Sequence, residues 1–154
     1  MTEQRRLLEE RLLPAFAARF QPSALVVNIG AGDHPYRTHF ICRYLTADRR
    51  PGCDLTFPVE AIPYTDASVD GLLFLSVLDR VDDPMRAMRE LWRVLKPGGL
   101  LLFGTAGLEF EVRKACERWR LSPGGVAHVL REFTRLESHD VDRVYHFAVV
   151  QKPA

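Results

Sequence analysis

The sequence predicts a single α/β domain, a three-layer sandwich built around a mainly parallel sheet. Short apolar runs alternate with helical patterns along the chain. One of these runs, residues 71–75, is uninterrupted and is typical of a strand that a parallel sheet buries on both faces. The chain has 154 residues, of which 47% are hydrophobic, so it can bury a core without disulfides or a structural metal. We expect residues 1–23 to form a leading helical segment and residues 24–154 to form the α/β core.

The leading segment has apolar residues at helical spacing, which predicts an amphipathic helix. These residues are Leu7, Leu8, Leu12, Phe16 and Phe20. Pro14 lies inside the pattern and lacks an N–H group, so it should kink or divide the helix.

The first half of the core alternates apolar runs with short connections. Its strands are predicted at residues 24–29, 43–47, 53–57 and 71–75. Residues 34–42 leave room for barely two helical turns between the first two strands. This crossover is therefore close to the shortest that a parallel pair allows.

The second half begins with a helix start at Asp83, a capping residue followed by Pro84. The helix should stop at residues 96–99, before a strand at 100–103. Val112, Cys116 and Trp119 predict a further helix that ends near residues 122–125. A short helix at 126–133 and a terminal antiparallel hairpin, with strands at 134–139 and 144–150, complete the prediction.

Composition excludes several classes of function. The chain has 21 Lys and Arg residues and 20 Asp and Glu residues, and like charges form no block. The sequence therefore lacks the basic patch that is typical of proteins that bind nucleic acid. Three widely separated cysteines indicate neither a disulfide framework nor a metal site. The first residues lack the apolar core of a signal peptide, and no run is long enough to span a membrane. We expect a cytoplasmic protein with reduced thiols and no membrane contact.

A turn after the first strand points to a small-molecule site. Residues 28–32 read Asn-Ile-Gly-Ala-Gly. Glycine allows the backbone to adopt φ > 0 and to approach a ligand closely, so Gly30 and Gly32 mark a floor for a bound molecule.

Four stretches together resemble the class I S-adenosylmethionine-dependent methyltransferases, in particular small single-domain proteins of the type 11 group. They are residues 28–32, Asp48 after the second strand, residues 62–81 and residues 93–99. The resemblance implies a Rossmann-like sheet of seven strands with an antiparallel last strand. It implies S-adenosylmethionine as cofactor and a small-molecule methyl acceptor.

The resemblance also implies which residues hold the cofactor. The glycine turn would pass under its methionine and ribose parts, and Asp48 would accept hydrogen bonds from both ribose hydroxyls. A carboxylate with two oxygens suits a vicinal diol. The full set of predicted cofactor-binding residues is Asn28, Gly30, Ala31, Gly32, Asp48, Arg49, Val59 and Leu75.

Three residues depart from the family pattern. Asn28 replaces the usual acid, His34 replaces a frequent third glycine, and Pro58 replaces an acid that contacts adenine. Adenine recognition would then use Leu55, Phe57 and Val59, or Asp54 in another register. Arg80 replaces a common histidine, and it could bind an acidic substrate or pair with Asp79, Asp82 or Asp83.

Methyl transfer mainly requires that the acceptor be held in line with the breaking bond. Where a base is needed, the weak candidates are His34, His39 and Asp79. The chain has no large lid, so a homodimer or a partner chain could complete the pocket.

Two other interpretations are dinucleotide binding and a noncatalytic protein of the same fold. Dinucleotide binding requires a third glycine where Pro35 stands. The main alternative is a noncatalytic regulatory or scaffolding protein of the same fold whose cofactor site has degraded.

Overall fold

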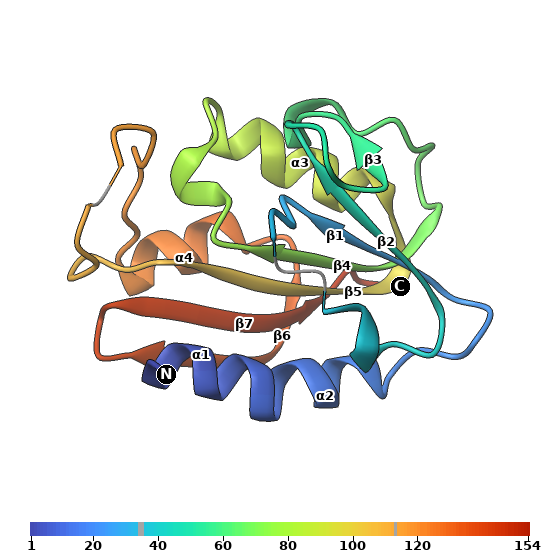
Figure 1. Cartoon of the computed structure of the whole chain (residues 1–154), viewed down its shortest axis with the longest axis horizontal. Coiled ribbons are helices and arrows are strands. Elements are labelled where there is room, and N and C mark those ends of the chain that lie inside the picture. The colour runs from blue at the N-terminus through green and yellow to red at the C-terminus, as the bar shows by residue number, and fades with distance from the viewer. Residues whose placement is uncertain (34–35, 113) are drawn as a thin grey trace.

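The computed structural model describes residues 1–33, 36–112 and 114–154 and has the predicted three-layer α/β architecture (Figure 1). Its seven strands lie in the order β3-β2-β1-β4-β5-β7-β6. They are β1 (Leu25–Ile29), β2 (Arg43–Asp48), β3 (Leu55–Thr56), β4 (Val69–Leu75), β5 (Leu95–Ala106), β6 (Thr134–Val141) and β7 (Tyr145–Gln151). The first five pair in parallel, and β7 is antiparallel to β5 and β6. The predicted fold class is confirmed.

The centre of the sheet explains where a ligand can bind. β4 is buried on both faces, with Leu72, Leu73 and Phe74 all 0% exposed. β1 pairs with β2 on one side and with β4 on the other, so the strand order switches direction at β1. In open α/β sheets, ligands bind beyond the carboxyl ends of the strands at such a switch point.

A leading helix covers one face of the sheet. It consists of α1 (Glu3–Leu7), a π-helical turn (Leu8–Leu12) and α2 (Leu13–Ala17), and it runs below β6 and β7 in Figure 1. The Leu13 N–H group donates to the Leu8 carbonyl, five residues back, immediately before Pro14. Pro14 therefore divides the helix by a change of hydrogen-bond pattern, while the chain remains helical.

The other face carries α3 (Pro84–Val94), α4 (Pro123–Val129) and a 3₁₀ turn, Val59–Ala61. As predicted, Asp83 caps α3, with its Oδ1 atom accepting from the Arg86 N–H group at 2.9 Å. The buried stripe of α3 packs into the larger core cluster. Short 3₁₀ turns, Arg37–His39 and Leu78–Arg80, complete the described elements.

Arg93 fixes the segment that leads from β3 to β4. Its guanidinium donates to the Ile62 and Tyr64 carbonyl oxygens at 2.9 and 2.8 Å. It also donates to the carboxylates of Glu90 and Asp66. One side chain thus ties the end of α3 to a stretch of chain that has little regular structure.

The helix predicted through Val112, Cys116 and Trp119 is wrong. The described residues between β5 and α4 form an irregular loop, in which the side chains of Val112 and Trp119 are 60% and 40% exposed. Residues 122–125 begin a helix instead of ending one, because the Ser122 hydroxyl accepts from the Gly125 N–H group and caps α4. The short helix predicted at 126–133 therefore starts at Pro123 and ends at Val129.

Smaller differences concern the ends of elements. The segment after the glycine turn forms a single 3₁₀ turn, Arg37–His39, and β3 has only two residues. β5 begins at Leu95, so it includes residues 96–99. None of the described helices combines the length and apolar character needed to cross a membrane.

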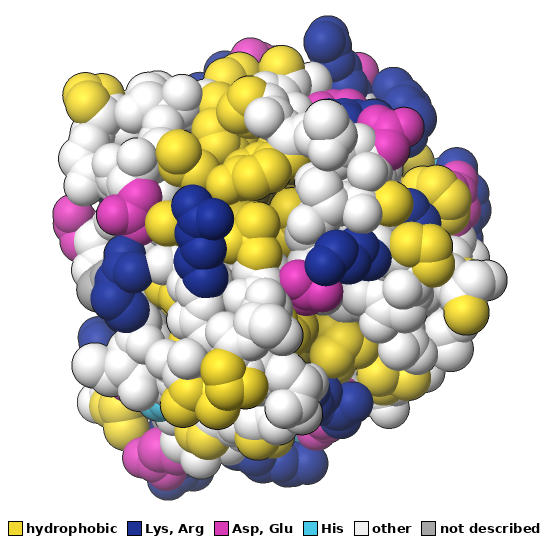
Figure 2. Space-filling model, turned by 90° about the vertical axis from the view of Figure 1, so that its right-hand side faces the viewer, with side chains coloured by type: hydrophobic (Ala, Val, Ile, Leu, Met, Phe, Trp, Pro, Cys, Tyr) yellow, Lys and Arg dark blue, Asp and Glu magenta, His cyan; other side chains and the backbone are white. Residues whose placement is uncertain are grey.

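The two ends of the sheet differ in what they present. Figure 2 shows the end where the parallel strands begin, at the right of Figure 1, with hydrophobic side chains gathered in one area beside several Lys and Arg side chains. At this end Asp70 accepts from the Leu25 N–H group and pairs with Lys96. The strands end at the opposite side of the molecule, where the described residues between β5 and α4 project as a loop (Figure 1).

Candidate functional site

The glycine turn after β1 has the backbone geometry that the sequence predicts. Gly30 and Gly32 have φ values of +71° and +50°. A Cβ atom on Gly30 would lie 2.2 Å from a methyl group of Val77, the residue that follows β4 by two positions. The Gly30 and Ala31 N–H groups both donate to the Ala47 carbonyl. Only a residue without a side chain fits between this turn and Val77.

Asp48 ends β2 beside the same turn. Its Oδ2 atom accepts from the Gly32 N–H group at 3.2 Å, and its Oδ1 atom accepts from the Arg50 N–H group at 2.9 Å. Its side chain is 12% exposed, and the Arg50 guanidinium lies 3.7 Å away. The carboxylate is therefore oriented by backbone donors on both oxygens and still reaches solvent.

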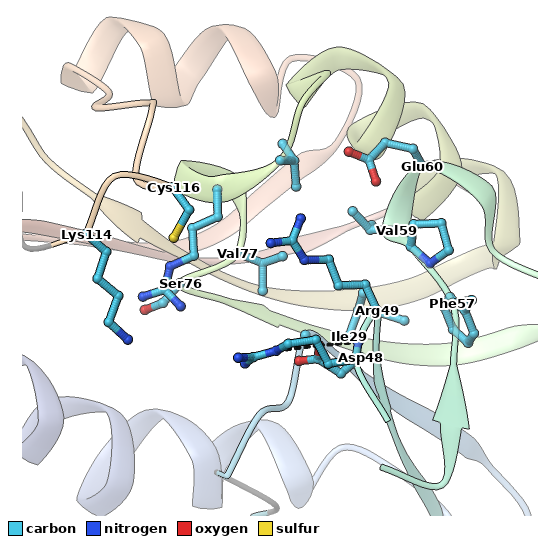
Figure 3. Close-up of a pocket in the computed structure, with 15 residues that line it drawn as sticks. Ile29, Asp48, Arg49, Phe57, Val59, Glu60, Ser76, Val77, Lys114 and Cys116 are labelled. Atoms are coloured by element: carbon cyan, nitrogen blue, oxygen red, sulfur yellow. Dashed lines mark hydrogen bonds and ion pairs between the residues drawn. The ribbon is translucent and has the colours of Figure 1, made fainter. Parts of the chain in front are cut away.

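A cavity of about 160 Å³ opens at the carboxyl ends of the parallel strands (Figure 3). Its walls come from the ends of β1 and β2, the segment after β3, the turn after β4 and the loop after β5. The lining residues are Ile29, Gly30, Asp48, Arg49, Arg50, Phe57, Pro58, Val59, Glu60, Ser76, Val77, Arg80, Val81, Lys114 and Cys116. In Figure 3, Phe57 and Val59 lie at one end of the cavity, and Lys114 and Cys116 at the other.

The lining is rich in cations. It holds Arg49, Arg50, Arg80 and Lys114, against the two acids Asp48 and Glu60. The Arg80 guanidinium lies 3.6 Å from an Asp79 oxygen and 3.5 Å from a Glu117 oxygen, and both carboxylates are buried. Asp79 and Glu117 therefore offset the charge of Arg80, and at this end, formed by the turn after β4 and the loop after β5, Lys114 is the lining cation that has no ion pair with a described residue.

A pair of hydroxyls, from the exposed Ser76 and the buried Tyr145, lies at the same end, which we call the β4 end. Ser76, directly after β4, has φ of +57°, and its hydroxyl lies 2.5 Å from the Tyr145 hydroxyl. The Ser76 N–H group donates to the Gly104 carbonyl at 2.9 Å. Burial is the main cause that raises the pKa of Tyr145, so this phenol stays protonated at neutral pH. It holds the Ser76 hydroxyl in place at the cavity wall.

Four of the eight predicted cofactor-binding residues line the cavity, namely Gly30, Asp48, Arg49 and Val59. Of the other four, Gly32 contacts Asp48 through its N–H group, and Ala31 is buried within the turn. Leu75 packs against the core cluster of the leading helix. Asn28 is 2% exposed and alternates with Ile29, so it points to the opposite face of the sheet from that lining residue. All eight roles remain predictions.

The structure also locates the residues considered for adenine recognition. Phe57, Pro58 and Val59 line the cavity, whereas Leu55 does not. Asp54 accepts from the Thr46 N–H group and from Arg37, so its carboxylate is engaged in holding β2 to the loop before β3. This leaves apolar side chains at that end of the cavity.

The two candidate bases that the structure describes, His39 and Asp79, are not brought to the cavity. His34 lies outside the described residues, and His39 belongs to the 3₁₀ turn Arg37–His39 and is not a lining residue. Asp79 is 3% exposed, and burial raises the pKa of its carboxyl. Its carbonyl accepts from the Arg118 and Trp119 N–H groups, so Asp79 anchors the loop after β5. Among the described residues, no three His, Cys, Asp or Glu side chains gather as a metal site.

Sequence reasoning missed five residues of the β4 end. Lys114, Cys116 and Glu117 lie in the loop that was predicted as a helix, and Tyr145 comes from the hairpin. Ser76 follows the strongest strand signal in the chain, and that position was the one available clue.

Comparison with known proteins gives a consistent result. Residues 41–103 match the family model described as a methyltransferase domain. The chain is 37% identical over 82 residues to the biotin biosynthesis bifunctional protein BioHC of Teredinibacter turnerae, covering 52% of this chain and 14% of that protein. It is 29% identical over 169 aligned positions to a malonyl-[acyl-carrier protein] O-methyltransferase of Methylococcus capsulatus, covering 94% and 59%. This chain thus spans less than two thirds of either relative.

A solved structure shares the fold over most of the chain. It is the 1,6-didemethyltoxoflavin-N1-methyltransferase of Burkholderia thailandensis, determined with S-adenosylhomocysteine, and it superimposes with a TM-score of 0.72. The match has 20% sequence identity and covers 94% of this chain and 78% of that one. At this identity the likeness shows a common fold.

Proposed function

Because this chain belongs by its fold and its methyltransferase-domain match to the class I S-adenosylmethionine-dependent methyltransferases, we propose that it methylates a small-molecule acceptor in the described cavity. The observation that carries the proposal is Asp48, a carboxylate oriented at the cavity wall beside a glycine turn. The cofactor of this family is S-adenosylmethionine, which when bound supplies an electrophilic methyl group on a sulfonium.

The hydrogen-bonding capacity of Asp48 fits a ribose. A carboxylate has about four lone-pair sites. Backbone N–H groups of Gly32 and Arg50 use one site on each oxygen. One site on each oxygen remains, which suits the two neighbouring hydroxyls of a ribose.

The rest of the cavity fits the other parts of the cofactor. Phe57 and Val59 offer apolar surface for adenine at the β3 end of the cavity. Gly30 lets the backbone of the turn lie directly against Val77 at the cavity wall, and we place the methionine chain along this wall. These residues bind and orient, which is the main demand that methyl transfer makes on a protein.

Two curated relatives are named as O-methyltransferases of malonyl-[acyl-carrier protein]. An oxygen acceptor should therefore be tested first. A malonyl thioester is therefore a suitable first probe for activity. Whether a partner chain completes the acceptor pocket remains a prediction. Such a chain would be sought at the exposed Trp119, whose indole N–H group donates to the carbonyl of the lining residue Val81.

The proposal is tested by calorimetric titration of the full chain with S-adenosylhomocysteine. We expect binding by the wild type and a loss of about 1–2 kcal/mol, close to tenfold in affinity, for Asp48→Asn, because a charged acceptor becomes neutral. Asp142→Asn, in the exposed β6–β7 turn, is the matched control and should bind as the wild type does. Absence of binding at millimolar ligand would refute the proposal and favour a noncatalytic role.

A further inference from the structure

We propose that the β4 end of the cavity is an acceptor subsite for an anion, with Lys114 and Arg80 holding a carboxylate of the acceptor beside Ser76. This inference rests on the proposed function, which assigns the opposite end of the cavity to the nucleoside. It names the chemical class of the acceptor and the residues that recognise it.

Position separates this subsite from the cofactor residues. Asp48, Phe57 and Val59 come from the ends of β2 and β3. Ser76 and Arg80 come from the turn after β4, and Lys114 comes from the loop after β5. In Figure 3 the Lys114 side chain extends from that loop at the end of the cavity away from Phe57. The β4 end is therefore free for a second molecule when the first occupies the β2 and β3 end.

Charge at this end favours an anion. The lining acids Asp48 and Glu60 lie on the β2 and β3 side with Arg49 and Arg50, and at the β4 end the buried carboxylates of Asp79 and Glu117 lie beside Arg80. Lys114 is therefore the cation whose charge no described residue offsets at this end. Lys114 is exposed, and its ammonium group has no ion pair with any residue that the structure describes. An unpaired cation at the mouth of a cavity attracts a negatively charged ligand and raises its local concentration.

Arg80 has capacity to spare. Its two ion pairs, made through Nε and Nη2, are long, at 3.6 and 3.5 Å, and its Nη1 group has no hydrogen bond or ion pair with a described residue, whereas the Nε atom is buried. A guanidinium presents five donors in a planar fork that matches a carboxylate. Asp79 and Glu117 hold this fork at the cavity wall and leave donors for a ligand.

Ser76 adds a directed hydroxyl. Tyr145 fixes its oxygen at 2.5 Å, and when the phenol donates to that oxygen, the serine proton is available to the cavity. Ser76 is thus a third donor near the two cations, and the subsite offers donors only, which suits a carboxylate oxygen.

The lack of a base supports the same acceptor. Neutral hydroxyl or amine acceptors lose a proton on methylation and often need a general base. The described lining contains no histidine, and its two carboxylates lie at the other end. A carboxylate is already ionised at neutral pH. One of its oxygen lone pairs forms the new C–O bond, the electron pair of the breaking C–S bond stays on sulfur, and no proton moves.

The test uses the full chain with the malonyl thioester of N-acetylcysteamine, and with the analogue whose free carboxylate is replaced by a neutral amide. Methyl ester formation is followed by mass spectrometry and S-adenosylhomocysteine affinity by calorimetry. Lys114→Gln is the main variant, because an exposed and unpaired side chain can be replaced without loss of the fold. Arg89→Gln, an exposed charge on α3, is the matched control.

We expect Lys114→Gln to lower kcat/KM for the malonyl probe about tenfold and Lys114→Glu to lower it further, because an attractive charge is removed and then reversed. Affinity for S-adenosylhomocysteine should stay within about twofold of the wild type, since the charge lies outside the proposed nucleoside end. Arg89→Gln should match the wild type, and the amide analogue should not be methylated.

Three results would overturn the inference while leaving the proposed function intact. They are unchanged kcat/KM in Lys114→Gln, methylation of the amide analogue as efficient as that of the malonyl probe, and no methyl ester from the malonyl probe although S-adenosylhomocysteine binds. A parallel fall of S-adenosylhomocysteine affinity in Lys114→Gln would assign this cation to the cofactor and also overturn it. Failure of the wild type to bind S-adenosylhomocysteine would refute the proposed function itself.

Discussion

Replacement of Gly30 by alanine tests whether the turn after β1 is shaped by contact with the turn after β4. The new Cβ atom would lie 2.2 Å from a Val77 methyl group, which is closer than carbon atoms approach in proteins. The backbone also has φ of +71° there. Gly98→Ala is a matched control, because Gly98 has φ of +78° and nothing within 4 Å of an added Cβ atom.

The two costs can be estimated separately. A left-handed backbone costs an alanine about 1–2 kcal/mol. Forcing an extra methyl into a filled space costs about 1–3 kcal/mol more. Gly98→Ala should therefore lose only the first amount and Gly30→Ala the sum, about 2–5 kcal/mol. In a domain of this size each kcal/mol lowers Tm by roughly 2–4 °C.

Urea and thermal unfolding measure the difference, and the Val77→Ala background identifies its cause. Removing the valine methyl groups should recover the contact cost but not the backbone cost, giving a coupling energy of about 1–3 kcal/mol between positions 30 and 77. Equal destabilisation of Gly30→Ala and Gly98→Ala, or independence of the two positions, would refute the reasoning.

Three further predictions concern single side chains. Asp79→Asn should alter the pH dependence of stability. Burial raises the pKa of the Asp79 carboxyl in the folded state. The wild type therefore loses stability as the pH rises from the pKa of the unfolded state through that of the folded state. The variant should lack this loss when urea unfolding is compared at acidic and neutral pH. Ser122→Ala removes the oxygen that accepts from the Gly125 N–H group and should lower the free energy of unfolding by about 1 kcal/mol. Ser122→Asp keeps an acceptor oxygen and should restore this stability, as measured by thermal unfolding. Arg93→Lys removes the planar guanidinium that donates to two carbonyls and two carboxylates, and it should lower the free energy of unfolding by about 1–3 kcal/mol. An unchanged midpoint of urea unfolding would contradict this role.

The sequence predicted the sheet well because the strands are short, apolar and separated by strong turn signals. The run at 71–75 is fully apolar and became the centre of the sheet. Asp83 followed by Pro84 gave the correct start of α3. The same capping signal stands at Ser122-Pro123, but the two glycines after it suggested a stop, and the helix was placed on the wrong side of them.

The loop between β5 and α4 could not be predicted from local pattern. Its apolar residues follow helical spacing, yet its backbone N–H groups at Arg118 and Trp119 bond to the Asp79 carbonyl, about forty positions earlier in the chain. Such long-range bonds leave no periodic signal. The β4 end of the cavity depends in part on this loop, so the sequence singled out Asp48 and Arg80 but did not indicate that Lys114 and Cys116 line the same cavity.

The π-helical turn in the leading helix has a consequence for chain length. A turn closed over five residues holds one residue more than an α-helical turn, so it accommodates a single insertion without shifting the apolar side chains on either side of it. A chain shortened by one residue within Leu8–Leu12, at the exposed Glu10, should fold this segment as a continuous α-helix with Phe16 still against the sheet. Homologues with one residue fewer at this point would then carry the same helix in its regular form.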